Sequence, residues 1–308
     1  MYEQPLHDLV KTAIQQLHTS MAQTSPFMAE QIGEWMRQLS GNIPPENYFL
    51  HPSAYPMLLL PWWCDQTYRT TVNLALQTSL VYSTINGYYY IRLIDNLMDD
   101  RQAETERQLL PALNFFHTEF LTAYHSHFPT NHPFWQHFKT VWFYSAEVTL
   151  RDAKLTEIDL NLFKQVVAPK LCAVKIPVIA VCYDHDRPEL IAPWVEFIDL
   201  LSCWHQMMND LFDWHTDSAQ HIQTYFLSEA QRRKKTTESV AAWVSREGFA
   251  WGSQLLHEWM AELRGMAQTL ANDDLVHYLD ERETLFTQRE QDALKGLKSI
   301  SQLLQVFS

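Results

Sequence analysis

Two short acidic segments carry the side chains best suited to chemistry. In the first, Asp95 and Asp99 are four residues apart, so on a helix they project from one face about 6 Å apart along the axis. Arg92 lies one turn earlier on that face, and Asp100 lies about 100° further round the helix. Like charges at this spacing destabilise a helix by about 0.2–0.5 kcal/mol, so they favour a compensating cation. The other interpretation is a solvated helix end that leads into a loop.

The second acidic segment, residues 206–217, places three oxygen-bearing side chains in a row. Asn209, Asp213 and Asp217 follow one another at four-residue steps along one helix face, and Asp210 flanks the row. The positions between them are apolar, namely Met207, Met208, Leu211, Phe212 and Trp214. An acidic helix can show this spacing by chance. The hard oxygen ligands also suit Mg²⁺, which binds a few carboxylates, waters and substrate phosphate oxygens.

Together the two segments predict one metal site. The helices are about 110 residues apart in the sequence and could face each other with metal ions between them. The residues expected to act in catalysis at one cavity mouth are Asp95, Asp99, Asn209, Asp213 and Asp217. Asp100 and Asp210 are further predicted metal ligands, and both lie off the main rows.

The paired motifs resemble those of the class I isoprenoid (terpenoid) synthases, and most closely those of the squalene/phytoene synthase branch. The first motif of that branch, R-x-x-D-x-x-x-D-D, is matched by Arg92, Asp95, Asp99 and Asp100. The second, Q-x-x-N-x-x-x-D-x-x-x-D, is matched by Gln206, Asn209, Asp213 and Asp217. The second segment is also similar to the terpene cyclase pattern N-D-x-x-S-x-x-x-E, with Asp213 and Asp217 at the Ser and Glu positions.

This resemblance implies an all-helical fold, a Mg²⁺ cofactor and a prenyl diphosphate substrate. It implies that metal ions held by both acidic helices assist departure of the diphosphate, and that an apolar, aromatic pocket directs the allylic cation. Tyr88 and Phe212 are the aromatic residues predicted to contact this substrate, because ring faces stabilise cations by about 0.5–2 kcal/mol each. Arg92 is predicted to bind the substrate as well.

Departures from the squalene/phytoene pattern bear on the reaction type. Residues 170–183 read KLCAVKIPVIAVCY and lack the tyrosine and glycines of that branch, and Phe212 stands where an arginine is usual. These departures favour cyclisation of one prenyl diphosphate, whereas the full first motif favours head-to-head coupling of two. Strict D-D-x-x-D motifs are missing, which disfavours chain elongation. A non-catalytic prenyl-binding relative and a purely structural helical bundle are the remaining alternatives.

Basic residues near the motifs are candidate diphosphate ligands. Lys170 and Lys175 lie in an apolar segment, where a lysine either extends its amine to solvent or neutralises a buried anion. Five residues apart on a helix, they point about 140° away from each other, so one cleft does not take both. The basic run 232–235 either closes over the diphosphate or forms a solvated face.

Composition limits the other function classes. The chain has 308 residues, 46% of them hydrophobic and only 7 glycines, and it lacks the glycine-rich nucleotide-binding motifs. Its formal charge of −13 disfavours nucleic acid as a partner. The four cysteines are scattered and the N-terminus lacks a signal peptide pattern, so we expect reduced thiols and a cytoplasmic location. The apolar stretch 54–64 is expected either to pack as a buried loop or to touch a membrane surface. No feature indicates an oligomeric state.

Apolar residues recur at three- and four-residue spacing through most of the chain, which predicts an all-α fold. We expect one domain over residues 1–308, a bundle of about ten helices around a central cavity. Ser25 and Pro26 predict the start of a helix that ends at Leu39. The other predicted helices cover residues 65–100 with an interruption near 86–87, 103–127, 133–152, 159–183, 189–217, 228–247, 249–271 and 275–305.

Overall fold

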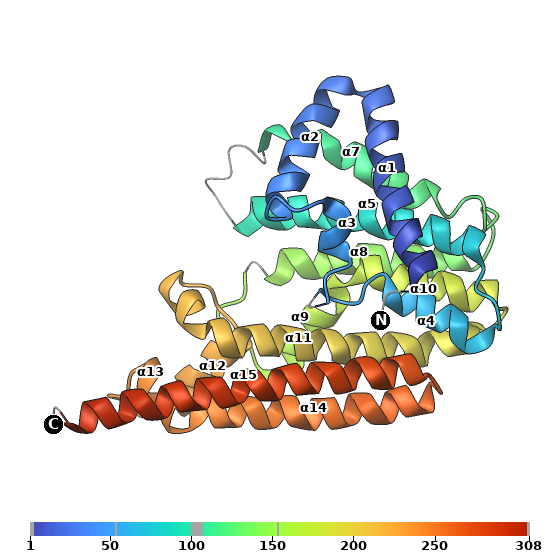
Figure 1. The fold of residues 1–308 in the computed structure, drawn as a ribbon. Helices are drawn as coiled ribbons and strands as arrows, with labels where there is room; N and C mark the ends of the chain where they lie inside the picture. The colour runs from blue at the N-terminus through green and yellow to red at the C-terminus, as the bar shows by residue number, and fades with distance from the viewer. Residues whose placement is uncertain (1–2, 53, 100–106, 153, 307–308) are drawn as a thin grey trace. The chain divides into compact units, whose positions relative to one another are not determined.

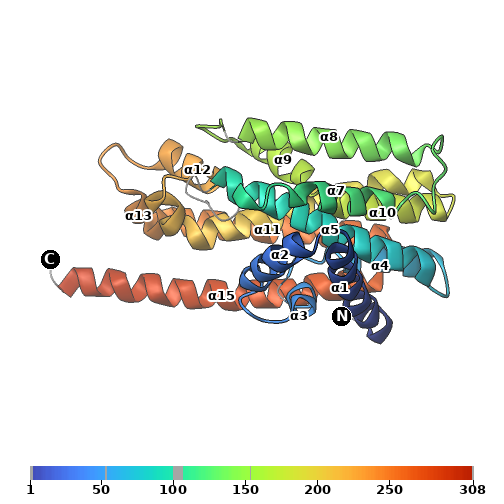
Figure 2. The same cartoon turned by 90° about the horizontal axis from the view of Figure 1, so that it is seen from above.

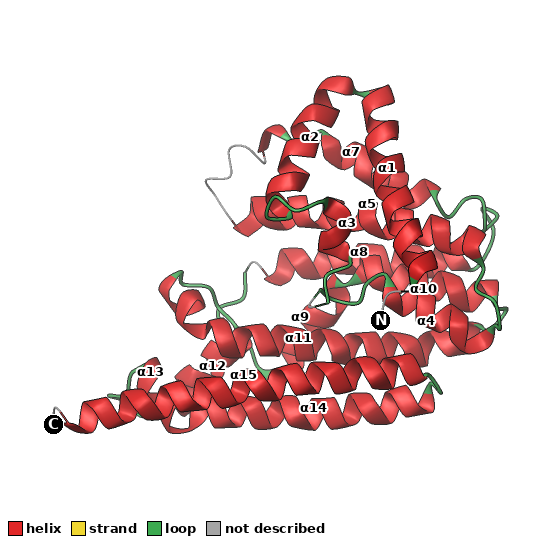
Figure 3. Ribbon diagram, in the orientation of Figure 1, coloured by secondary structure: helices red, strands yellow, loops and turns green. Residues whose placement is uncertain are grey.

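The computed structural model describes residues 3–52, 54–99, 107–152 and 154–306. About 80% of the chain is helical, and no strand occurs in this described part, which confirms the all-α class (Figure 3). The chain divides into two compact units. The first comprises Met1–Phe143 and Cys172–Ile191, and the second comprises Tyr144–Leu171 and Ala192–Ser308. The single domain and its central cavity stay predictions.

The first unit is built around one long helix, α5. The helices of this unit are α1 (Gln4–Thr24), α2 (Pro26–Leu39), α3 (Pro45–Phe49), α4 (Leu59–Tyr68), α5 (Leu74–Asp99), α7 (Ala112–Thr122), α10 (Cys172–Asp184) and the first half of α8 (Phe134–Asp152). The α2 prediction is confirmed at both ends. Helices α1 and α7 both pack on α5, and α2 packs on α1 (Figure 1). Helix α1 was not among the predicted helices, although Leu6, Val10 and Leu17 give it a buried face.

Helix α5 continues through Asn86 and Gly87, so the interruption predicted there is wrong. A Cβ atom at Gly87 would lie 2.9 Å from the ring of Phe120 in α7, so the missing side chain lets the two helices approach closely. The predicted helix 65–100 is broken instead between Tyr68 and Leu74. The Asp65 carboxylate accepts a hydrogen bond there from the backbone N–H of Asn73, at 2.9 Å, which holds the turn.

The apolar stretch 54–64 belongs largely to the core of the first unit. Its residues from Leu59 onward form the start of α4, with Leu58 as the N-cap, and Leu58, Leu60, Trp62 and Cys64 are buried. This outcome matches the buried alternative, in helical form. No single helix in the described residues is long and apolar enough to cross a membrane. Only α9 (Leu160–Lys170) and α10 taken as a bent pair pass that test, and α10 is mostly buried.

The second unit is organised by three long helices. Its helices are the second half of α8, α9, α11 (Ile191–Ala219), α12 (Tyr225–Arg233), α13 (Val240–Trp243), a π-helical turn (Val244–Gly248), α14 (Phe249–Thr269) and α15 (Asp273–Val306). Helices α14 and α15 run side by side, and α15 is a single straight helix (Figures 1 and 2). Trp204 joins α11 to both, because its Nε1–H donates to the Leu256 carbonyl at 3.1 Å and its ring contacts Phe286.

Two further predicted helices are divided in the structure. The range 159–183 forms α9 and α10, which are separated at Leu171. Pro169 lies in the last turn of α9, where it cannot donate a backbone hydrogen bond to the preceding turn and so weakens the end of the helix. The range 228–247 forms α12, a loop, and the short α13 with its π-helical turn. Helices α8, α11, α14 and α15 agree with their predictions within a few residues.

Candidate active site

The first acidic motif lies on the last turns of α5, as its spacing predicted. Asp95 is half-buried and Arg92 is exposed. Asp99 is the last residue of α5, but its side chain lies outside the described part of the structure, as does the whole of Asp100. The described residues of this motif, Arg92 and Asp95, therefore lie one turn apart near the end of α5.

Tyr88 stands two turns before Asp95 on nearly the same side of α5, in an aromatic setting. Its hydroxyl is hydrogen-bonded to the hydroxyl of Tyr48 in α3, and its ring lies 5.2 Å from that of Phe49. Burial, and then the neighbouring Tyr48, raise the pKa of Tyr88, so its phenol stays neutral at physiological pH. Helix α5 thus carries, two turns before Asp95, a neutral Tyr88 hydroxyl within an aromatic cluster.

The second acidic motif lies on α11, and its four oxygen-bearing side chains differ in exposure. Asn209 and Asp213 are exposed, Asp217 is half-buried, and Asp210 is only 2% exposed. A four-residue step turns about 40° further round a helix, so the row slants across the helix surface toward the side of Asp210. This slant accounts for the greater burial of Asp217.

The row on α11 carries negative charge that its surroundings do not balance. Within the described residues, neither Asp213 nor Asp217 forms an ion pair. Burial, and then the negative charge of Asp213, raise the pKa of Asp217, while His215 lowers it by a smaller amount. Two carboxylates that repel each other in this way are a natural binding place for a divalent cation.

Asp210 has a different environment from the row. Its Oδ1 accepts a hydrogen bond from Nε2 of Gln206 at 2.8 Å, and the backbone N–H groups of Tyr225 and Phe226 also donate to its carboxylate. Burial dominates and raises the pKa of Asp210 to about 7, against the lowering effect of these donors. The Asp210 side chain therefore points toward the start of α12, inside the second unit.

The donor set of α11 fits Mg²⁺ in part. In the part of the chain that the structure describes, no three His, Cys, Asp or Glu side chains gather closely enough to hold a metal ion. The two carboxylates and one amide of the row are nevertheless the hard oxygen donors that Mg²⁺ uses when substrate phosphates and waters complete its coordination. Whether the two acidic rows face each other stays a prediction, as does each residue's role.

The predicted cationic ligands are placed differently from one another. Lys175 is only 5% exposed, in the apolar helix α10. Lys170 is paired with the Asp152 carboxylate. Arg232 and Arg233 both bind Glu229, and Arg232 also reaches Glu157 at 2.8 Å. The start of the basic run is thus engaged in ion pairs of the second unit.

Phe212 lies in an aromatic cluster that brings a guanidinium beside α11. Its ring contacts Phe249 of α14 and Phe286 of α15, and the guanidinium carbon of Arg289 lies 4.2 Å from its centre. Arg289 is exposed and forms no ion pair among the described residues. Sequence reasoning missed Arg289, because one arginine in a long charged helix carries no signal until α15 is packed against α11.

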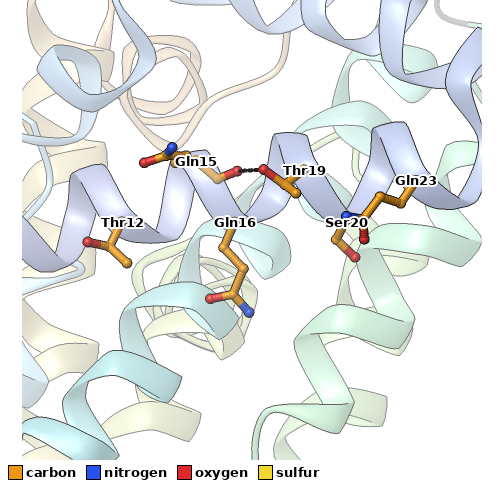
Figure 4. A pocket seen from close by; sticks show the side chains of 6 residues that line it. All are labelled: Thr12, Gln15, Gln16, Thr19, Ser20 and Gln23. Atoms are coloured by element: carbon orange, nitrogen blue, oxygen red, sulfur yellow. Dashed lines mark hydrogen bonds between the residues drawn. The ribbon is translucent and has the colours of Figure 1, made fainter.

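A separate surface hollow lies along α1 in the first unit, away from either motif in sequence. Figure 4 shows the side chains that line it, namely Thr12, Gln15, Gln16, Thr19, Ser20 and Gln23. All are polar and uncharged, and Thr19 donates its hydroxyl hydrogen to the Gln15 carbonyl. No titratable side chain lies among these six residues to activate the Thr12, Thr19 or Ser20 hydroxyl.

Comparisons with known proteins bear on the fold. No protein-family model matches the chain, and no curated protein is similar to it in sequence. Among solved structures, it is similar to an FPPS from T. brucei in complex with a small compound, with a TM-score of 0.59 and 10% identity, over 92% of this chain and 99% of that one. It is also similar to a geranylgeranyl pyrophosphate synthase, with a TM-score of 0.52 and 12% identity, over 96% and 98% of the two chains.

Both neighbours are prenyl diphosphate synthases, and both likenesses extend over nearly the whole of each chain. At these levels of identity the likeness concerns the fold alone. The chain has the all-helical fold of the isoprenoid synthases.

Proposed function

We propose that this protein is a Mg²⁺-dependent isoprenoid synthase that ionises an allylic prenyl diphosphate. The observation that carries the proposal is the row Asn209, Asp213 and Asp217, whose charge is unbalanced, on a long helix of an isoprenoid synthase fold. The matching motif on α5, with Arg92 and Asp95, supports it.

In the proposed reaction, the allylic C–O bond breaks and its electron pair leaves with the diphosphate. Mg²⁺ supplies charge neutralisation for this leaving group. Asp95, Asp99, Asn209, Asp213 and Asp217 would hold the metal, and the guanidinium groups of Arg92 and Arg289 would bind diphosphate oxygens directly. A buried lysine such as Lys175 is suited to neutralising an anion in the same site.

The aromatic residues would protect the cation that remains. In this proposal the half-buried rings of Tyr88 and Phe212 would exclude water from the cation, and a ring face free to meet it would contribute about 0.5–2 kcal/mol. Arg289 already covers one face of Phe212. Lys170 is a weaker substrate ligand in this proposal, because Asp152 already balances its charge.

We favour cyclisation of one prenyl diphosphate over coupling of two. Phe212 is embedded among Phe249 and Phe286, and the 172–182 part of α10 is apolar and buried apart from Lys175, so the region lacks the residues associated with head-to-head coupling. The full R-x-x-D-x-x-x-D-D motif favours coupling as the second candidate. A cytoplasmic location is part of the proposal, supported by four free, buried thiols.

The test is to incubate the purified protein and Mg²⁺ separately with C10, C15 and C20 prenyl diphosphates, then measure released diphosphate and identify products by mass spectrometry. A cyclic product of unchanged carbon number supports cyclisation. A C30 or C40 hydrocarbon, or a cyclopropyl diphosphate intermediate, establishes head-to-head coupling instead. Absence of Mg²⁺-dependent diphosphate release with every substrate would leave a non-catalytic prenyl-binding protein.

A further inference from the structure

Asp210 and Asn209 are neighbours in the sequence, but their side chains have opposite surroundings. Asn209 is exposed, whereas Asp210 is 2% exposed and accepts hydrogen bonds from Gln206 and from the first backbone N–H groups of α12. A buried carboxylate that already accepts three hydrogen bonds has little capacity left for a metal ion. Asn209 is therefore available as an exposed oxygen donor, whereas Asp210 is engaged inside the second unit.

The chain reverses direction between the acidic row and this anchor. His221 has a φ of 58°, in the left-handed region, and the Ile222 N–H donates to the Asp217 carbonyl at 2.9 Å. The reversal brings Tyr225 and Phe226 back to Asp210, which lies about two turns before Asp217 on α11. Asp210 thus closes the loop 218–224, and Asp217 lies at the base of that loop.

The N-terminus of α12 is held mainly by side chains. Thr224 caps it by accepting from the Leu227 N–H at 3.2 Å, and Asp210 takes the two preceding N–H groups. A carboxylate at a helix N-terminus is stabilised by both the free N–H groups and the helix dipole. Asp210 thus ties the start of α12 to α11, and Asp217 is close enough that its negative charge contributes to raising the pKa of Asp210.

We infer that Asp210 is a positioning residue that sets the orientation of Asp217 for metal binding, by tying the start of α12 to α11, and is not itself a metal ligand. This inference rests on the proposed function for the role of Asp217. It differs from the pattern-based expectation for Asp210, which the motif alone had placed among the ligands.

The test is a double-mutant cycle on Mn²⁺ binding in the presence of inorganic pyrophosphate, measured by electron paramagnetic resonance. We expect Asp210→Ala to weaken Mn²⁺ binding about tenfold, as loss of a supporting residue does. The double variant with Asp217→Asn should bind Mn²⁺ no more weakly than Asp217→Asn alone, because the anchor acts through Asp217. Additive losses would show that Asp210 is a ligand, and unchanged binding in Asp210→Ala would show a purely structural role; either result overturns the inference.

Hydrogen exchange gives a second readout that needs no activity. Asp210→Ala should speed exchange of the Tyr225 and Phe226 amides, and unchanged protection would also overturn the inference. Asp210→Asn, which keeps the shape and one acceptor, serves if the alanine variant does not fold. Asp159→Asn is the matched control, because Asp159 caps α9 through the Leu162 N–H at 2.8 Å; it should leave Mn²⁺ binding unchanged.

The outcomes separate this inference from the proposed function. If the wild-type protein binds Mn²⁺ with pyrophosphate but turns over no prenyl diphosphate, the catalytic proposal fails while the cycle still decides the role of Asp210. If the wild-type protein binds no Mn²⁺, the metal site fails and the positioning role fails with it.

Discussion

The acidic ends of α5 and α11 share a four-residue spacing of carboxylates but differ in how each is supported. On α5, Arg92 lies one turn from Asp95, and the Tyr88 hydroxyl, two turns before Asp95, is hydrogen-bonded to the Tyr48 hydroxyl. On α11, Asp213 and Asp217 repel each other without an ion-pair partner in the described residues. The difference teaches that the same residue types at a similar spacing can have different surroundings.

This difference suggests a division of labour between the two motifs. In the proposed function, the α11 row would bind metal through carboxylates that have no ion-pair partner in the described residues, and the α5 motif would contribute a carboxylate together with a guanidinium for the diphosphate. Four predictions test and sharpen this comparison.

The largest effect is expected on α11. Asp213→Asn should lower kcat/KM about 10²–10³-fold, because it removes an exposed carboxylate from the row that carries the proposed metal site. Steady-state diphosphate release at saturating Mg²⁺ measures it. Asp292→Asn, an exposed aspartate on α15 that interacts with Lys295, is the control and should change the rate less than twofold.

A smaller effect is expected on α5. Asp95→Asn should lower kcat/KM about 10–10²-fold, because Arg92 remains one turn away to bind the diphosphate. The same assay applies, with the exposed Asp8→Asn of α1 as the control. A larger loss for Asp95→Asn than for Asp213→Asn would reverse the order of the two motifs.

Each motif helix makes a close contact at a glycine: α5 packs on α7 at Gly87, and α11 packs on α14 at Gly252. The two sites differ in how easily the neighbouring side chain can move. Gly87→Ala in α5 should destabilise the protein by about 1–3 kcal/mol, because the new Cβ meets the rigid Phe120 ring at 2.9 Å. Gly252→Ala in α14 should cost less, because its close neighbour is the movable Cδ1 of Leu211 in α11, at 2.7 Å. Thermal or urea unfolding measures both.

Gly265 of α14 serves as the control, because a Cβ atom added there would meet nothing within 4 Å. Gly265→Ala should stabilise the protein by up to about 1 kcal/mol.

The smallest effect concerns acid stability and belongs to α11. Burial, with a minor contribution from Arg282, lowers the pKa of His205 to about 3, and its Nε2 lies 3.0 Å from the Tyr278 hydroxyl. The unfolded state, with a pKa near 6.5, binds the proton more readily, so stability is lost as the pH falls below 6.5. Between pH 6.5 and 5 we expect a loss of about 1–2 kcal/mol.

Urea unfolding at the two pH values measures this loss. His205→Gln keeps a neutral side chain able to bond Tyr278 and does not titrate, so its stability should change less over the same range. An equal pH dependence in wild type and variant would show that another group is responsible.

The sequence predicted the elements better than the connections between them. The start of α2 at Pro26 and both motif helices followed from local signals, namely proline position and four-residue spacing. The break at Leu171 was missed because apolar periodicity continues across it, and α1 was missed although Leu6, Val10 and Leu17 recur at helical spacing.

What the sequence by itself determined is the all-α class and the placement of both acidic motifs on helices, because helical periodicity and i, i+4 spacing depend on residues within two or three turns. Only the tertiary structure decided that Gly87 continues α5, that Asp210 turns inward to α12, and that Arg289 lies over Phe212. Each of these depends on contact between helices distant in the sequence. Burial and partner donors, which residue order does not reveal, then assign different roles to side chains of the same chemical type.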